Sequence, residues 1–217
     1  MNSAILFDMD GVVLDTEPLY TNAQTKLFKE YGISIPKEDW GLFCGCSEEE
    51  FYTLSMKKYN ITESRSIFIK KGQNYIREEF TNNLCFMPGF YQLINRIKNK
   101  HKIGLVTASP KHMLNWLLKR IELDSFFNYI ISGEDAKRNK PFPDPYLMMM
   151  RNLNVKPSNC IIIEDSAPGI KAAIDSGAYV IAKTGSTPLL KLKKAHYIVN
   201  HLDEITNLLI NNLLNNK

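Results

Sequence analysis

Five short runs of apolar residues are spread along the chain, and their length and pattern predict β-strands. They are nearly continuous in apolar residues rather than alternating, which is typical of strands covered on both faces of a sheet. A weaker sixth run lies near the C-terminus. The predicted strands are Ala4–Phe7, Ile103–Val106, Tyr129–Ile131, Cys160–Ile163, Tyr179–Ala182 and Tyr197–Val199.

Segments with helical spacing lie between these strands. In one of them Phe90, Leu93, Ile94 and Ile97 would share one face of a helix. The alternation of strand and helix predicts an α/β fold, a doubly wound (Rossmann-like) parallel sheet with helices on both faces. The predicted helices of this part are Phe90–Lys98, Met113–Ile121, Pro145–Leu153, Ala167–Ser176 and an amphipathic tail that docks on the core, Leu208–Leu214.

The stretch between the first two strands breaks the alternation, because its pattern indicates helices and no convincing strand. We therefore expect two domains, an α/β core of residues 1–14 and 85–217 and an inserted all-helical domain of residues 15–84. The expected hinges are Leu14–Thr16 and Leu84–Gly89, with Thr16 as the N-cap of the first inserted helix. The inserted helices are predicted at Pro18–Tyr31, Ser47–Tyr59 and Ser64–Phe80, the last with a candidate interruption at Gly72.

Composition places the chain among ordinary globular proteins. Of its 217 residues, 44% are hydrophobic and 23% are charged, and the net charge is +4. The basic residues are dispersed and form no stripe with interleaved aromatic residues, so we expect no nucleic-acid partner. No apolar run approaches the roughly 18 residues that span a bilayer, so we also expect no membrane partner. No obligate protein partner is evident.

The N-terminus and the cysteines predict the location. The first residues lack a basic start, and Asp8 and Asp10 interrupt the apolar stretch, so they do not resemble a secretory signal. The four cysteines form no C-x-x-C pair and no zinc-type spacing with histidine. We interpret them as reduced structural thiols and expect the protein in the cytoplasm.

Polar side chains follow directly after several predicted strands or precede a helix. Because the carboxyl ends of parallel strands meet at one edge of the sheet, these groups are expected to gather there. A D-x-D-G sequence is by itself equally well explained as a polar turn, but the further groups favour a site. The candidate residues are Asp8, Asp10, Thr107, Ala108, Ser109, Lys140, Glu164 and Asp165.

The charges of this set point to a chemistry. Four carboxylates in one cleft repel one another unless a cation lies among them, and oxygen ligands alone favour Mg²⁺. A carboxylate that attacks a phosphate dianion meets the same repulsion, which Mg²⁺ and Lys140 would relieve. In the segment that follows Lys140, Asp144 is a candidate N-cap for the helix that begins at Pro145.

Four motifs in order carry a resemblance that covers essentially the whole chain. They are DMDGVVLDTE, VTASP, KPFPDP and IEDSAPG. Together they resemble the haloacid dehalogenase-like (HAD) phosphohydrolases, in the branch of sugar-phosphate phosphatases and β-phosphoglucomutase. The helical insert resembles the C1-type cap domain of that family.

The resemblance implies a role for each core residue. Asp8 corresponds to the nucleophile that forms an aspartyl-phosphate, and Asp10 to the general acid and base. Thr107 and Lys140 correspond to phosphate-binding residues, and Ala108 and Ser109 to neighbouring substrate contacts, with helix capping as the alternative for Ser109. The implied Mg²⁺ ligands are Asp8, Asp10 through its carbonyl, Asp165, and Glu164 directly or through water.

Cap residues are expected to contact the substrate, a small phosphorylated metabolite. Tyr20 stands where the mutases carry a histidine, and Glu48 where they carry an arginine that grips a second phosphate. An acid at that place repels a second phosphate. Lys71 matches a cap lysine of that branch, or is a solvated helix lysine. Ser166 and Gly169 are expected to shape the last motif's loop.

These departures favour a Mg²⁺-dependent phosphatase, a phosphoric monoester hydrolase, with a sugar phosphate as the first candidate substrate. A β-phosphoglucomutase-type phosphomutase is the alternative, and a non-catalytic phosphometabolite-binding protein is the third hypothesis. Which phosphorylated substrate is used, which cap residues select it, and the oligomeric state are not readable from the sequence.

Overall fold

A computed structural model describes residues 3–43, 46, 48–185 and 187–215, and its contacts divide the chain into two compact units. The first unit comprises Met1–Val13 and Phe86–Lys217, and the second comprises Leu14–Cys85. These limits lie one residue away from the predicted domain boundaries. At the junction Asp15 N donates to Cys85 O at 3.0 Å, within the second unit.

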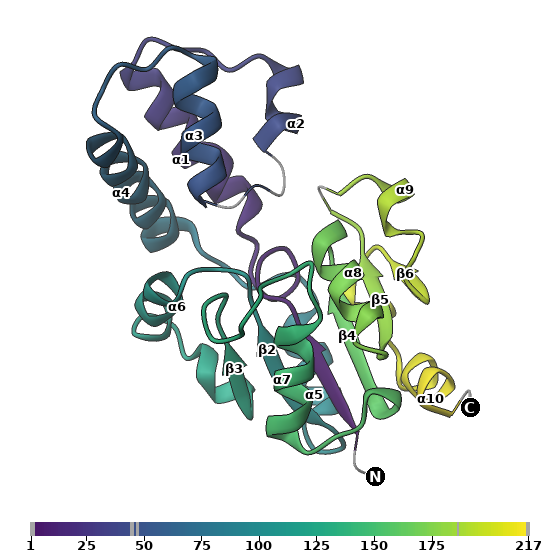
Figure 1. The fold of residues 1–217 in the computed structure, drawn as a ribbon. Coiled ribbons are helices and arrows are strands. Elements are labelled where there is room, and N and C mark those ends of the chain that lie inside the picture. The colour runs from purple at the N-terminus through teal and green to yellow at the C-terminus, as the bar shows by residue number, and fades with distance from the viewer. Residues whose placement is uncertain (1–2, 44–45, 47, 186, 216–217) are drawn as a thin grey trace. The chain divides into compact units, whose positions relative to one another are not determined.

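The first unit contains a parallel sheet, as predicted, in the order β3-β2-β1-β4-β5-β6 (Figure 1). The first strand is therefore central, with β2 on one side and β4 on the other. The strands are β1 (Ala4–Phe7), β2 (Lys102–Val106), β3 (Tyr129–Ile131), β4 (Cys160–Glu164), β5 (Tyr179–Lys183) and β6 (Tyr197–Val199).

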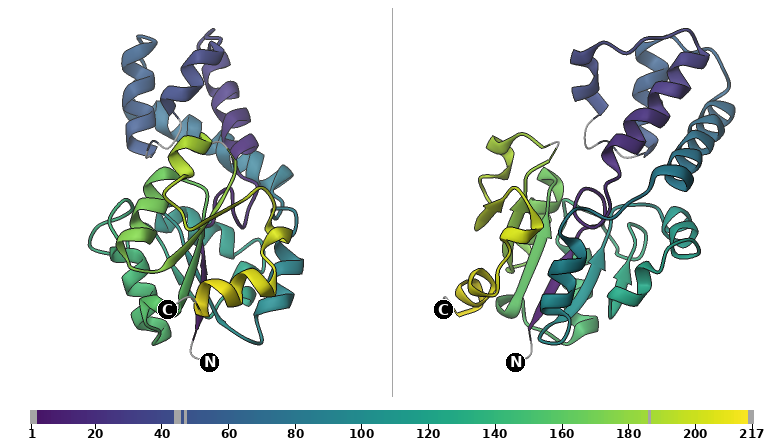
Figure 2. Two further views of the ribbon diagram at one scale, coloured as in Figure 1. Left: turned by 90° about the vertical axis from the view of Figure 1, so that its right-hand side faces the viewer. Right: turned by 180° about the vertical axis from the view of Figure 1, so that it is seen from behind.

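Helices cover both faces of this sheet, since its strands are apolar on both sides. Figure 1 shows α7 and α8 in front of the sheet, and Figure 2, seen from behind, shows α5 on the opposite face. The helices are α5 (Phe90–Ile97), α6 (Lys111–Leu118), α7 (Asp144–Leu153), α8 (Ala167–Asp175), α9 (Leu189–Leu192) and α10 (Asn207–Asn215), with 3₁₀ turns at Leu123–Phe126, Pro157–Asn159 and Leu202–Glu204.

Alternate residues of β1 pack against the helices on the two faces of the sheet. Ala4 and Leu6 pack in the cluster that α7 and α8 complete, while the ring of Phe7 lies edge-on to Phe90 of α5 at 6.1 Å between centroids. All four residues of β1 are fully buried. The predicted tail helix also docks on the core, through the buried side chain of Ile210.

The second unit consists of helices in its described residues, as its pattern predicts. Its core is aromatic, and the Phe28 ring lies within 6.4 Å of the rings of Phe43, Phe51, Tyr59 and Phe68. Its elements are α1 (Glu17–Glu30), a 3₁₀ turn (Lys37–Asp39), α2 (Trp40–Phe43), α3 (Glu48–Lys58) and α4 (Arg65–Asn83).

Some local predictions are wrong. The helix α4 continues through Gly72, and the absence of a side chain there leaves room for the Tyr52 ring, whose hydroxyl a Cβ would overlap. The prediction that Thr16 is the N-cap of α1 is confirmed, although its hydroxyl makes no capping bond because the residue already has helical dihedrals. The short helices α2 and α9 are too brief to show helical periodicity. Two predictions lie outside the described residues: the helix start at Ser47 and the structural thiol of Cys44.

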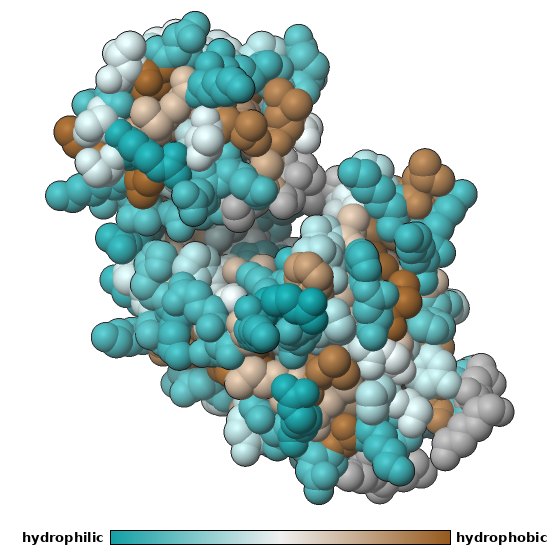
Figure 3. All heavy atoms as spheres, in the orientation of Figure 1, coloured by the Kyte–Doolittle hydropathy of each residue, from teal (hydrophilic) through white to brown (hydrophobic). Residues whose placement is uncertain are grey.

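The surface, the helices and the cysteines relate to the expectations about membranes and thiols. On the face drawn in Figure 3, hydrophobic residues are scattered among hydrophilic ones. Among the described residues, no helix combines the length and apolarity that crossing a membrane requires. Cys85 and Cys160 are free thiols.

The contact of β2 with α7 depends on a glycine and yields a prediction about stability. A Cβ at Gly104 would lie 2.6 Å from Met149 Sδ and 3.0 Å from Leu6 Cδ2, so Gly104→Ala overpacks the core. We expect it to lower the free energy of unfolding by about 1–3 kcal/mol in urea denaturation. The control is Gly41→Ala in α2, where a Cβ meets nothing within 4 Å. Equal stability of both variants would contradict this account.

Candidate active site

The end of β1 places two carboxylates at the carboxyl edge of the sheet. Asp8 continues the strand, since its N–H donates to Ile163 O at 3.0 Å, and the residue is 7% exposed. Gly11 follows in a left-handed conformation with φ of 73°. A Cβ at Gly11 would overlap the Asp165 carboxylate, so only glycine brings the loop after β1 this close to the loop after β4.

The end of β2 places two hydroxyls beside these acids. Thr107 is fully buried, and its Oγ1 accepts a bond from Ser109 N at 2.9 Å. The Ser109 hydroxyl donates to Asp10 Oδ2 at 2.9 Å. The capping alternative for Ser109 is wrong, because α6 has Pro110 as its N-cap and no side-chain cap. Ala108 between them is exposed and offers its carbonyl to Asn139 Nδ2 at 3.3 Å.

The lysine reaches the same edge from the loop after β3. Lys140 Nζ lies 2.5 Å from Asp8 Oδ1, 2.7 Å from Glu164 Oε1 and 2.9 Å from Val106 O. Its side chain is only 4% exposed. An ammonium group has three protons, so these three acceptors satisfy it completely. The buried ion pairs thus join the ends of β1 and β4 to the loop after β3.

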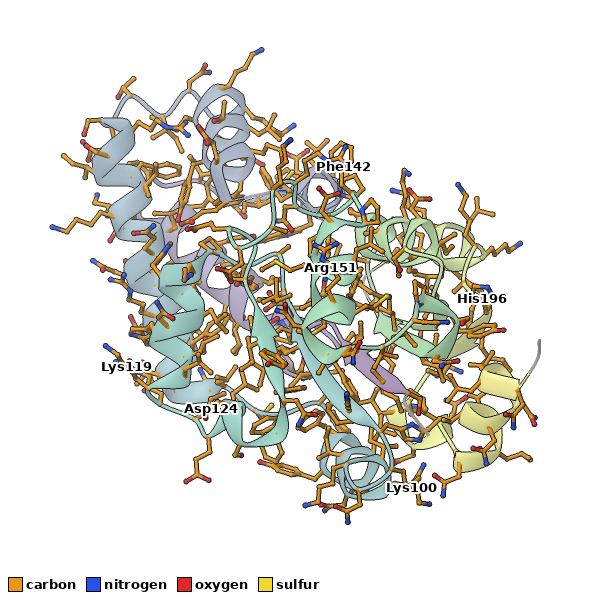
Figure 4. The ribbon with its side chains drawn as sticks, turned by 60° about the horizontal axis from the view of Figure 1, so that its bottom comes forward. Lys100, Lys119, Asp124, Phe142, Arg151 and His196 are labelled. Atoms are coloured by element: carbon orange, nitrogen blue, oxygen red, sulfur yellow. The ribbon has the colours of Figure 1, made fainter. Side chains whose placement is uncertain are left out.

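The loop that carries Lys140 is fixed at its surface side by Arg138. The guanidinium forms two hydrogen bonds with the Asp144 carboxylate, at 3.1 and 2.9 Å, and lies 4.3 Å from the centre of the Phe142 ring. Figure 4 labels Phe142 in this loop and Arg151 in the last turn of α7. The prediction that Asp144 is an N-cap is wrong, because the helix already includes it and Arg138 takes its carboxylate.

The end of β4 supplies the last two acids. Glu164 is fully buried, and its Oε1 accepts from Lys140 Nζ and from the Tyr146 hydroxyl at 2.8 Å. Its Oε2 accepts from Asp165 N and Ser166 N, both at 3.1 Å, and from the Ser166 hydroxyl at 3.0 Å. Ser166 Oγ also accepts from Gly169 N at 3.1 Å and so caps α8, which confirms that these two residues shape the loop.

Burial and charge shift the pKa values of these groups. Burial is the main cause that raises the pKa of Asp8 to about 8; Lys140 opposes this rise, while Glu164 and Asp10 add to it. Burial disfavours the charged form of Glu164 as well, but the ion pair and hydrogen bond with Lys140 hold its pKa below the ordinary value. Burial likewise opposes the charge on Lys140, and Asp8 and Glu164 raise its pKa. One buried cation therefore faces several acids.

These acids have the composition of a site for a hard divalent cation. Oxygen atoms of Asp8, Glu164 and Asp165 all lie within 4.8 Å of one another, and all are carboxylate oxygens. The donor set therefore fits the predicted metal, and a divalent cation among them would offset the excess negative charge. Glu164 already accepts five hydrogen bonds, so a direct bond to a cation would compete with some of them.

The three predicted cap residues lie in the second unit. The Tyr20 ring packs against Phe80 at 5.2 Å. Glu48 Oε1 accepts from Gln73 Nε2 at 2.9 Å, whereas Lys71 Nζ lies 3.1 Å from Glu30 Oε2 and 4.8 Å from the centre of the Tyr31 ring. The role of Tyr20, Glu48 and Lys71 in substrate binding stays a prediction.

Two polar residues that support the site, Tyr146 and Arg138, are not among the residues predicted from the sequence. Tyr146 binds Glu164, and Arg138 binds Asp144, but neither Tyr146 nor Arg138 belongs to a motif identified in the sequence. The sequence does contain a signal for Tyr146. It lies on the apolar side of a predicted helix, and a buried phenol hydroxyl needs a hydrogen-bond partner. Arg138 carried no such signal, since charged residues are common in loops.

The electrostatics of the site predict a gain in stability when Asp8 loses its charge. An acid whose pKa is higher in the folded chain stabilises the fold only while protonated, so its contribution is lost as the pH rises from about 4 to 8. In EDTA at pH 8 we expect Asp8→Asn to be more stable than the wild type by about 1 kcal/mol or more, roughly 2–4 °C in melting temperature. The exposed Asp124→Asn should show no such gain. Melting of Asp8→Asn at or below the wild-type temperature would contradict this expectation.

Comparisons with known proteins agree with this fold and this arrangement of residues. The family model of haloacid dehalogenase-like hydrolases matches residues 5–183. Among curated proteins, the chain is 32% identical to the "Phosphorylated carbohydrates phosphatase" of Thermotoga maritima, over 80% of this chain and 81% of that protein. It is also 32% identical to the "Probable pseudouridine-5'-phosphatase" of Drosophila melanogaster, over 81% of this chain and 79% of that one.

A solved structure supports the same conclusion. The crystal structure of β-phosphoglucomutase from Clostridium difficile superposes with a TM-score of 0.78 and 30% sequence identity, over 99% of this chain and 98% of that one. The predicted resemblance and fold class are therefore confirmed, and the enzymatic class is supported by relatives that are named phosphatases. The chain belongs to the haloacid dehalogenase-like hydrolase family.

Proposed function

We propose that the protein is a Mg²⁺-dependent phosphatase that hydrolyses a small phosphorylated metabolite through an aspartyl-phosphate on Asp8. The observation that carries this proposal is the buried Lys140 ammonium, which bonds both Asp8 and Glu164 at the sheet edge where Asp165 and Asp10, the latter bonded by Ser109, also lie. Such a group of acids with one lysine suits a phosphate dianion only when a metal balances the charge. Relatives named phosphatases support the same reaction class.

In the first step a carboxylate oxygen of Asp8 attacks phosphorus, and the bond between phosphorus and the ester oxygen breaks. Asp10 donates a proton to the leaving oxygen, so the product alcohol departs neutral. The Ser109 hydroxyl, 2.9 Å from Asp10 Oδ2, orients this acid. Thr107 binds the transferring phosphoryl group, and the positive charge of Lys140 attracts and stabilises it.

In the second step Asp10, now a carboxylate, takes a proton from water. The water oxygen attacks the phosphorus of the aspartyl-phosphate, and the bond to the Asp8 oxygen breaks to release inorganic phosphate. Asp8, Asp165, the Asp10 carbonyl and Glu164, directly or through water, would hold Mg²⁺, and the bound ion would offset charge on the phosphate oxygens. The helical unit, residues 14–85 with its predicted hinges, acts as the cap that selects the substrate.

A phosphomutase is the second candidate, because the chain resembles β-phosphoglucomutase over nearly its whole length. Glu48 argues against a mutase. It stands where the mutases carry an arginine, and an acid at that position repels the second phosphate that a mutase must bind. The structure adds that Lys71 is paired with Glu30 and Glu63, at 3.1 and 3.7 Å, so its charge is already balanced. We therefore place hydrolysis first, and a sugar phosphate as the first candidate substrate, in keeping with the carbohydrate phosphatase of Thermotoga maritima.

The test of this ranking is a release assay for inorganic phosphate across sugar, polyol and nucleotide monophosphates with Mg²⁺. A parallel assay follows the conversion of glucose 1-phosphate to glucose 6-phosphate with a bisphosphate primer. We expect phosphate release and little isomerisation. Fast isomerisation with negligible phosphate release would favour the mutase.

Loss of the nucleophile should abolish turnover. In Asp8→Asn the amide is a poor nucleophile, so we expect phosphate release to fall at least about 1,000-fold. Asp10→Asn should cost about 100- to 10,000-fold, as is usual for a general acid and base. Asp124→Asn, an exposed acid of the same unit that Figure 4 labels, is the matched control and should keep full activity. More than a tenth of wild-type activity in Asp8→Asn would exclude the covalent mechanism.

Removal of the metal should stop the reaction without unfolding the protein. In EDTA we expect phosphate release to fall to background and to return on addition of Mg²⁺. Ca²⁺ should not restore it, because it prefers more ligands and longer bonds than the octahedral Mg²⁺. Melting curves in the same buffers serve as the control for folding. Full activity in EDTA, or equal activity with Ca²⁺, would contradict the proposed cofactor.

A further inference from the structure

Tyr146 is a buried polar residue that the mechanism above does not use. It lies in the first turn of α7, is 0% exposed, and packs in the apolar cluster with Met149 and Leu153 of the same helix. Phenylalanine would fill the same space, and packing alone gives no reason for the hydroxyl. That hydroxyl donates to Glu164 Oε1 at 2.8 Å.

The Tyr146 side chain contacts both members of an ion pair. Its hydroxyl shares Glu164 Oε1 with Lys140 Nζ, which lies 2.7 Å from the same oxygen. Its ring lies beneath the ammonium, with 5.1 Å between Lys140 Nζ and the ring centre. Tyr146 therefore contacts Glu164 directly through its hydroxyl. It contacts Lys140 through its ring and also through the Glu164 oxygen that the two residues share.

The two oxygens of Glu164 are held in different ways. Oε2 receives its three bonds from the adjacent loop, at Asp165 and Ser166. Oε1 faces Lys140, and Tyr146 is the one uncharged donor to it among the described residues. A phenol satisfies this oxygen without adding positive charge that would compete with Lys140. Without the hydroxyl, Oε1 would depend on the lysine alone.

We propose that Tyr146 is a positioning residue for the phosphoryl-transfer site. It holds Glu164, which in turn keeps the Lys140 ammonium beside Asp8, where the phosphoryl group must bind. This inference rests on the proposed function for its chemistry. The link from Tyr146 through Glu164 to Lys140 rests on the contacts alone.

The test is Tyr146→Phe, which removes one oxygen and keeps the packed ring. A hydrogen bond to a charged group is worth enough that its loss should lower kcat/KM for p-nitrophenyl phosphate by about 10- to 100-fold. The dissociation constant for inorganic phosphate, measured by calorimetry with Mg²⁺, should rise by a similar factor. The control is Tyr52→Phe, whose buried hydroxyl has no hydrogen-bond partner in the described structure and should leave both quantities unchanged.

A double-mutant cycle separates positioning from a general structural role. If Tyr146 acts through Glu164, then in the Glu164→Gln background Tyr146→Phe should change kcat/KM and phosphate affinity less than about 2-fold. Independent effects that multiply in the double variant would overturn the proposal. So would a Tyr146→Phe protein with a lower melting temperature but wild-type kinetics and phosphate affinity.

The outcome also distinguishes this inference from the proposed function. A wild-type protein that releases no phosphate from any phosphomonoester would disprove the phosphatase, but the phosphate titrations of the same variants would still test the link. A working phosphatase in which Tyr146→Phe matches Tyr52→Phe would disprove the positioning role alone.

Discussion

The buried contact between Lys140, Asp8 and Glu164 is the interaction on which the rest of the site depends. It brings together the ends of two neighbouring central strands and a loop from a third, and none of the three side chains is more than 10% exposed. Taking such charges out of water is costly unless each is paired and hydrogen-bonded, and here the ammonium has three acceptors and Glu164 has five donors. Asp8 is the member whose charge is least well satisfied, and burial shifts its pKa accordingly. A buried carboxylate with so few partners is suited to bind a cation.

The sheet makes this contact possible because its strand order puts β1 in the centre. With β2 and β4 on either side, the loops after these strands open at the same edge, which is where ligands bind in open α/β sheets. Gly11 and Gly169 then let the loops approach one another and Glu164, since a side chain at either position would overlap a carboxylate. The apolar strands below are buried on both faces and support the edge where the chemistry is proposed.

Expectations from the sequence succeeded where one local signal dominated. The strand ranges follow apolar runs, and Ala4–Phe7, Tyr129–Ile131 and Tyr197–Val199 agree with the structure at both ends. The predictions were wrong at positions where tertiary contacts override local rules such as helix breaking by glycine and helix capping by Asp or Ser. Gly72 lies inside a continuous helix, where the close approach of Tyr52 leaves no room for a side chain. Asp144 pairs its carboxylate with Arg138 and does not cap the helix N-terminus. Ser109 likewise bonds Asp10 rather than capping α6, because the strand order brings the two loops together.

The sequence by itself determined the alternation of strands and helices, the helical insert, and the identity of the acids, hydroxyls and lysine at the ends of strands. Periodicity and the order of motifs are properties of neighbouring residues, so they can be read without a structure. Only the tertiary structure decided that Lys140 pairs with Asp8 and Glu164 together, and that Tyr146 donates to the same carboxylate. These contacts join residues 18 to 132 positions apart, and their geometry depends on how α7 packs on the sheet, which no local pattern encodes.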